Sequence, residues 1–291
     1  MSTTNQPMDG KICMITGATD GIGKVTAHAL AKQGATVIIV GRNRQKSMAT
    51  VSEIRQESGN ANVEYMLADL SSQQAIRELA EQFKSKYQEL HVLLNNAGAM
   101  FMSRQESVDG IEMTFALNHL NYFLLTHLLL DTIKASAPAR IVNVSSRAHK
   151  RLKTLDFDNL QGEKSYSGMS AYMISKLGNV LFTYELAKRL QNSQVTVNAL
   201  HPGVVATQFG ANNGGWFGKL IRKFFNLFCI SVEEGAKTNI YLASSPDVEG
   251  VTGKYFNECK AIRSSKLSND EDVAQRLWKI SEELTGIGVA V

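Results

Sequence analysis

The chain has 291 residues, 44% of them hydrophobic, and a formal net charge of +4. A chain of this length can bury a full core, and no Pro/Gly/Ser linker or fixed repeat divides it, so we expect one domain. The mild charge, with basic and acidic residues interspersed, argues against nucleic-acid binding.

The cysteines and the apolar runs indicate the cellular compartment that we expect for the protein. Cys13, Cys229 and Cys259 are far apart and have no C-x-x-C spacing, so we expect neither a disulfide framework nor a metal site, and the composition favours the reducing cytoplasm. The N-terminus lacks the pattern of a signal peptide, and the longest apolar run, around 122–130, is too short to span a bilayer.

The first predicted elements are a strand at 12–15 and a helix at 25–33, joined by the glycine-rich turn 16–23. Glycines let the main chain turn tightly and approach a pyrophosphate, which the helix N-terminus then attracts. The spacing is G-x-x-x-G-x-G rather than the usual G-x-G-x-x-G. The turn by itself is therefore weak evidence, because such a turn can also bind nothing.

The second predicted strand, at 35–40, ends where a nucleotide-binding protein selects its cofactor. NAD-specific proteins place an acid there to bind the ribose 2′-hydroxyl, whereas this chain continues Gly41-Arg42-Asn43-Arg44. The planar guanidinium of Arg42 suits a 2′-phosphate, which favours NADP(H). The alternative is a solvent-facing arginine on a loop.

The following elements alternate between helix and strand. A helix with Met48, Val51 and Ile54 on one side precedes a strand at 63–67 and Asp69, and Ser71 with Gln74 forms a capping box for the next helix. Further strands are expected at 91–94, 140–144 and 195–200, and long helices at 111–134 and 170–191. The pattern predicts a single-domain α/β fold, a Rossmann-type doubly wound parallel sheet of about seven strands, with the last near 253–256.

We divide the domain into a cofactor-binding and catalytic core (8–207), a substrate lid (208–232) and C-terminal helices with the last strand (233–291). Ser231 and Glu234 predict a cap for the helix that follows the lid. The lid segment 216–230 is amphipathic, with aromatic residues on one side and basic residues on the other. It can cover an apolar substrate, make peripheral contact with a membrane, or simply pack on the core.

Several predicted strands end in residues that can take part in ligand binding or catalysis. The fourth runs into Asn95-Asn96-Ala97-Gly98 and the fifth into Ser145-Ser146, while Asn118 lies in an apolar helix. Tyr172 and Lys176 are four residues apart and so share one helix face. An ammonium beside a phenol favours the phenolate, so we expect Lys176 to lower the pKa of Tyr172 and make it an acid/base group.

In this order the motifs resemble the short-chain dehydrogenase/reductase family. The matching motifs are TGATDGIG (16–23), NNAG (95–98), Asn118, the serine after IVNVS, YMISK (172–176) and PGVVAT (202–207). Finer features resemble the retinol dehydrogenase branch, namely ALNHLNYFLLTHLLL, RIVNVSSRAH, SKLGNVLFTYELAKRL, ALHPGVV and GKYF-x-x-C. Asp20 stands where that branch often has another polar residue.

The resemblance implies a role for each matching residue. Tyr172 is the proton donor and acceptor, Lys176 assists it, Ser146 (rather than its rival Ser145) polarises the substrate oxygen, and Asn118 holds a relay water. The implied cofactor-binding residues are Gly17, Thr19, Asp20, Gly21, Ile22, Gly23, Arg42, Asp69, Leu70, Asn95, Ala97, Gly98, Tyr172, Lys176, Pro202, Gly203, Val204 and Thr207.

We therefore expect an NADP(H)-dependent oxidoreductase that interconverts an alcohol and an aldehyde or ketone, with a small lipophilic substrate that is retinoid-like or long-chain. One alternative is a reductase of polar or acyl-carrier-bound ketones. Another is a non-catalytic protein that senses NADP(H) on the same fold. A homo-oligomer is compatible with the sequence, which names neither the substrate nor the direction of the reaction.

Overall fold

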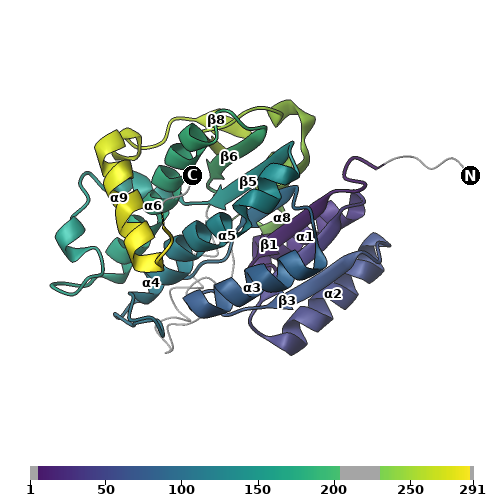
Figure 1. Ribbon diagram of the computed structural model, residues 1–291, viewed down its shortest axis with the longest axis horizontal. Coiled ribbons are helices and arrows are strands. Elements are labelled where there is room, and N and C mark those ends of the chain that lie inside the picture. Colours follow the sequence, from purple (N-terminus) through teal and green to yellow (C-terminus); the bar gives the residue numbers. More distant parts are fainter. Residues whose placement is uncertain (1–5, 204–229, 289–291) are drawn as a thin grey trace, which may run out of the picture.

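The computed structural model describes residues 6–203 and 230–288 (Figure 1). The predicted lid at 208–232 lies almost entirely outside these residues, as do the predicted cofactor contacts Val204 and Thr207. Among the described helices, none is both long and apolar enough to cross a bilayer.

Within the described residues one sheet of eight strands has the order β3-β2-β1-β4-β5-β6-β7-β8. Its strands are β1 (Ile12–Thr16), β2 (Thr36–Gly41), β3 (Val63–Leu67), β4 (Val92–Asn95), β5 (Ala139–Val144), β6 (Val195–Leu200), β7 (Lys254–Asn257) and β8 (Lys260–Ile262). All these neighbours pair in parallel except β7 and β8. The predicted Rossmann-type sheet is confirmed.

The short edge strand β8 is not part of the prediction. It pairs antiparallel to β7 across the two-residue turn Glu258-Cys259, in which both residues have a positive φ. Hairpin turns of this kind are normally recognised by Asn-Gly or Asp-Gly, so this sequence carries no usual signal for one.

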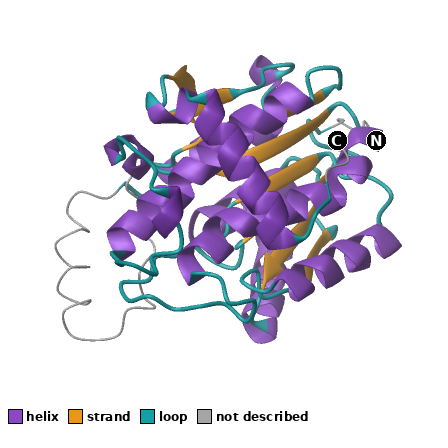
Figure 2. Cartoon of the chain, turned by 60° about the vertical axis from the view of Figure 1, so that its left-hand side comes forward, coloured by secondary structure: helices purple, strands orange, loops and turns teal. Residues whose placement is uncertain are grey.

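Helices cover both faces of the sheet (Figures 1 and 2). They are α1 (Gly21–Lys32), α2 (Arg44–Ser58), α3 (Gln73–Lys86), α4 (Met113–Phe115), α5 (Asn121–Ala135), α6 (Gly168–Arg189), α8 (Val232–Ser244) and α9 (Glu271–Thr285). Alternate residues of each inner strand enter opposite layers: Met14 packs with α3 and α5, whereas Cys13 and Ile15 pack with α1 and α8. Both faces of these strands are therefore buried, as expected for a parallel sheet.

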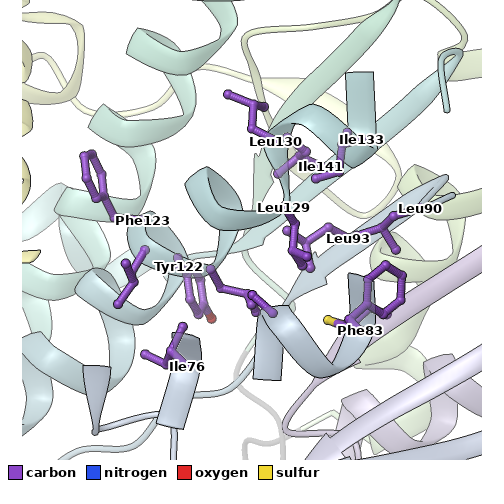
Figure 3. Close-up of a cluster of buried hydrophobic side chains, with 14 of the residues drawn as sticks. Ile76, Phe83, Leu90, Leu93, Tyr122, Phe123, Leu129, Leu130, Ile133 and Ile141 are labelled. Atoms are coloured by element: carbon purple, nitrogen blue, oxygen red, sulfur yellow. The ribbon is translucent and has the colours of Figure 1, made fainter. Parts of the chain in front are cut away.

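The larger core layer lies between the sheet and helices α3 and α5 (Figure 3). Phe83, Leu93 and Tyr122 are fully buried there, and each such side chain contributes about 1.5–3 kcal/mol relative to exposure. On the outer side, Trp278 of α9 packs against Phe123. This layer fixes the helices that carry the candidate site.

The cap of α3 and the inner face of α2 differ from the sequence prediction. The cap of α3 is Ser72, whose hydroxyl accepts from the Ala75 amide, whereas Ser71 hydrogen-bonds Asp69. Met48 is 52% exposed instead of lying on the inner face of α2. The cap of α8 is confirmed, because Ser231 accepts from the Glu234 amide at 3.1 Å.

Candidate active site

The glycine-rich turn packs tightly against the end of β4. A Cβ on Gly17 would lie 2.8 Å from Ala97 Cα, and one on Gly23 would lie 2.6 Å from Asn96 Nδ2, so larger residues do not fit. Thr16 Oγ1 accepts from the amides of Asn96 and Ala97 at 2.8 and 3.0 Å. Two strand ends are thereby held together around Gly17, whose φ is +65°.

The N-terminus of α1 offers main-chain donors beside this turn. Asp20 caps the helix by accepting from the Gly21 amide at 2.7 Å, while the first-turn amides of Ile22 and Gly23 have no acceptor within the helix. Asp20 also pairs with Lys46 of α2 at 2.8 Å, and this hydrogen bond lowers the pKa of its carboxyl. The carboxylate of Asp20 thus stays ionised but has its charge paired with Lys46, and the turn fits a pyrophosphate.

The predicted adenine-side residues lie at the ends of β2 and β3. Arg42 and Asp69 are exposed there, and Asp69 accepts from the hydroxyl of Ser71. Leu70 is only 6% exposed and packs in the larger core layer. Thr19 reaches across to the end of β2, because a Cβ on Gly41 would meet its methyl group at 2.6 Å.

The NNAG segment divides into an inward and an outward part. The Asn95 amide is buried and donates to Thr126 and Asn143, so its side chain belongs to the core, and its Oδ1 has no partner within the described residues. Gly98 faces the site, where a Cβ would lie 3.1 Å from Asn118 Oδ1 and 3.3 Å from Lys176 Nζ. A glycine thus keeps the space beside Lys176 open.

Asn118 interrupts the long helix predicted at 111–134. Residues Ala116–Leu120 form a π-helical turn between α4 and α5. The Asn118 amide donates to Ala99 O at 2.8 Å and to Ser175 Oγ at 3.0 Å, and its Oδ1 accepts from the Ala99 amide at 2.8 Å. Its side chain therefore connects the segment after β4 to α6.

The two adjacent serines at the end of β5 have different surroundings. Ser145 is buried and donates to the main-chain carbonyl of Lys176 at 2.7 Å. Ser146 is half-buried, accepts from the Ala148 amide at 3.1 Å, and hydrogen-bonds the hydroxyl of Tyr172. The geometry puts Ser146, not Ser145, beside the tyrosine.

Tyr172 and Lys176 lie one turn apart on α6. Lys176 Nζ donates to Val144 O at 3.0 Å and lies 5.9 Å from the centre of the Tyr172 ring and 5.6 Å from that of Tyr122. Burial lowers the pKa of Lys176 to about 7. Burial also raises the pKa of Tyr172 to about 12, against the opposing effect of the Ser146 hydrogen bond.

The expectation that Lys176 lowers the pKa of Tyr172 is therefore wrong for this structure. Removal from solvent disfavours the charged form of both groups, so the lysine tends to lose its charge and the phenol to keep its proton. The hydroxyl of Ser146 is the group that stabilises the phenolate here.

The last predicted cofactor-binding residues that the structure describes follow the end of β6. Gly203 has a φ of +88°, and its amide donates to His201 Nδ1 at 3.1 Å. Pro202 and Gly203 thus follow β6 at the same sheet edge as Ser146, which follows β5. From β3 to β6 this edge spans five strand spacings, about 24 Å.

Sequence reasoning missed the residues that support the site. Thr16 and Asn96 connect the glycine turn to β4, Ser175 anchors Asn118, and His149 contacts the Ser146 carbonyl. All four stand within motifs that resemble the family or its branch, and this is the one signal that could have identified them.

Comparison with known proteins identifies the family of the chain. The family described as short chain dehydrogenase matches residues 11–216. The chain is 45% identical to retinol dehydrogenase 12 of Mus musculus over 285 residues and to that of Homo sapiens over 284, in each case covering 98% of this chain and 89% of the relative. An uncharacterized protein from Mycobacterium paratuberculosis has a similar structure, with a TM-score of 0.78, 29% identity and coverage of 100% of this chain and 99% of that one.

Proposed function

Because the chain belongs to the short-chain dehydrogenase family, we propose that it is an NADP(H)-dependent oxidoreductase that interconverts an alcohol and an aldehyde or ketone. The observation that carries this proposal is the hydrogen bond between Ser146 and Tyr172, with Lys176 Nζ 5.9 Å from the tyrosine ring. These three groups lie at the sheet edge that also carries the glycine-rich turn.

In this proposal each residue of the site has a role in binding or in proton transfer. The bound dinucleotide supplies or accepts the hydride. The turn 17–23 binds its pyrophosphate, Gly98 leaves room beside Lys176, and positions 202–207 hold the nicotinamide end. Tyr172 donates a proton to the substrate oxygen, which Ser146 polarises. Since the pKa of Tyr172 is about 12, the phenol is protonated at neutral pH, which suits carbonyl reduction.

We propose a lipophilic substrate, such as a retinoid or a long-chain aldehyde. Met102 and Met169 are 58% and 40% exposed. A Cβ on Gly168 would lie 2.8 Å from Met102 Cα, so the segment that carries Met102 adjoins the start of α6, where Met169 precedes Tyr172. Methionine adapts to apolar ligands of irregular shape. The names of the relatives, retinol dehydrogenases, point in the same direction.

The preference for NADP(H) rests on Arg42 and on the absence of an acid after β2. Lys46 lies on α2 next to this position, held by Asp20.

We also propose that the protein acts in the cytoplasm, which the free thiols of Cys13 and Cys259 support.

The test follows NADPH oxidation with a panel of aldehydes and ketones. We expect turnover by the wild type, and Ser146→Ala should lower kcat roughly 10²-fold, as for loss of one donor to a developing oxyanion. The adjacent Ser145→Ala is the matched control and should mainly lower stability. NADPH binding without turnover of any substrate would favour a cofactor-sensing protein, and activity confined to polar ketones would favour the other alternative.

A further inference from the structure

The turn that follows Ser146 is held from two sides by one buried histidine. His149 lies in the 3₁₀ turn Arg147–Arg151 and is 0% exposed. Its Nδ1 lies 2.6 Å from Ser146 O, and its Nε2 lies 3.2 Å from the Ser265 amide nitrogen. Because the Ser265 N–H can only donate, Nε2 must accept, so the ring proton is on Nδ1 and is donated to Ser146 O.

The loop after β8, residues 263–268, contacts both elements that carry the site. Lys150, from the turn after Ser146, donates to Arg263 O at 2.7 Å. Tyr184, three turns after Tyr172 on α6, donates to Ser264 Oγ at 2.8 Å. Ser268 closes the loop by donating to Ser265 O at 2.8 Å. The loop thus connects the serine side of the site to the tyrosine side.

The direction of the Ser146 hydroxyl depends on the shape of this turn, because Ser146 Oγ accepts from the Ala148 amide. We propose that His149 is a positioning residue that holds the Ser146 main chain, so that the Ser146 hydroxyl faces Tyr172, and that loop 263–268 anchors His149 through Ser265. This inference rests on the proposed function and deepens it.

The surroundings of His149 keep its ring neutral, as the two hydrogen bonds require. The Tyr255 ring packs edge-on at 4.9 Å, and the Lys150 ammonium lies above that ring at 5.8 Å. Burial lowers the pKa of His149, the bond to Ser146 O opposes this, and the Lys150 charge adds to the lowering.

Two amide substitutions separate the two hydrogen bonds. His149→Asn places its amide nitrogen near the position of Nδ1 and keeps the donor to Ser146 O. His149→Gln reaches the position of Nε2 and keeps an acceptor for Ser265. We expect His149→Gln to lower kcat about 10- to 100-fold at unchanged KM and NADPH affinity, the range for small misplacements. His149→Asn, which loses only the anchor to Ser265, should lower kcat less.

A second buried histidine supplies the control. His91 accepts from the Ile12 amide at 3.1 Å, just before β4, at the amino ends of the strands and so on the side of the sheet away from the site. His91→Gln should therefore change the melting temperature but not kcat. In a Ser146→Ala background, His149→Gln should cause little further loss, because His149 acts through Ser146. Full additivity, or equal kcat for His149→Asn and His149→Gln, would overturn the proposal.

A readout independent of turnover keeps this inference separate from the proposed function. In ¹⁵N NMR of the wild-type protein, His149 should show the neutral tautomer protonated on Nδ1. A ring protonated on Nε2 would overturn the positioning role even if the enzyme is active or a variant fails to fold. Absence of wild-type turnover with NADPH, together with the Nδ1 tautomer, would refute the proposed function and leave the hydrogen-bond geometry intact.

Discussion

Replacing Lys176 with methionine should stabilise the protein at pH 6 while it removes the amine from the candidate site. Lys176 is 3% exposed, and burial lowers its pKa from 10.5 to about 7. Below pH 7 the folded protein therefore contains a buried ammonium that would be better solvated in the unfolded chain. Methionine has a similar length and no charge.

The expected gain in the free energy of unfolding follows from this pKa and from one lost hydrogen bond. The drop to about 7 corresponds to a cost of about 5 kcal/mol. Loss of the bond from Nζ to Val144 O offsets about 1.5–3 kcal/mol of this. Val144 O still accepts from Asn179 Nδ2 at 3.2 Å and from the Tyr122 hydroxyl at 3.5 Å. We expect the variant to be more stable by about 2–3 kcal/mol at pH 6.

The sign of the pH dependence is fixed by proton binding. Between pH 7 and 10.5 the unfolded lysine is protonated and the folded one is not, so wild-type stability rises with pH across this window. The advantage of Lys176→Met should be constant well below pH 7 and shrink by about 1.4 kcal/mol per pH unit above it.

Urea unfolding at pH 6, 7, 8 and 9 measures this difference. Lys188→Met is the control, because the Lys188 side chain is 52% exposed, and its ion pair with Glu271 should contribute within about 1 kcal/mol at every pH. A Lys176→Met protein less stable than wild type at pH 6, or a difference that does not change with pH, would refute the reasoning.

Three further predictions concern turnover. Tyr172→Phe should lower kcat about 10²–10⁴-fold with NADPH affinity nearly unchanged, and retention of more than about a tenth of kcat would contradict its role. Arg42→Asp should erase or reverse the preference for NADPH, a change of about ten- to a hundred-fold in affinity, whereas equal kcat/KM for NADPH and NADH in the wild type would contradict the premise. Along a series of aldehydes, each added CH₂ should raise kcat/KM by up to about fourfold, which corresponds to about 0.8 kcal/mol of burial free energy. Phe224→Ser or Phe225→Ser should flatten this rise. A flat wild-type profile would contradict a lipophilic substrate.

The fold could be predicted because its signals are local. Apolar strands such as Val63–Leu67 have the predicted bounds, and they alternate with capped helices along the whole core. Parallel strands also present their carboxyl ends at one edge, so the residues that follow them are expected to gather there. Ser146 and Gly98 accordingly lie at the edge that carries the glycine-rich turn.

The features of the site that could not be predicted depend on contacts between residues far apart in sequence. The π-helical turn at Ala116–Leu120 coincides with hydrogen bonds from Asn118 to Ala99 and Ser175, and helical periodicity alone does not reveal them. The spacing of Tyr172 and Lys176 predicts one shared face but not the burial that shifts both pKa values. His149 also escaped notice, because its partner Ser265 lies 116 residues away.

The carbonyl of Val144 has other donors besides Lys176, so the fold does not depend on a lysine at position 176. It accepts, within the described residues, from Lys176 Nζ, Asn179 Nδ2 and the Tyr122 hydroxyl, yet a carbonyl oxygen has only two lone pairs. The hydroxyl, at 3.5 Å, has the longest contact of the three. An uncharged side chain at 176 would let this hydroxyl bond more closely to Val144 and would remove the buried charge. We therefore expect the fold to lose little, which supports the proposed role of Lys176 beside Tyr172.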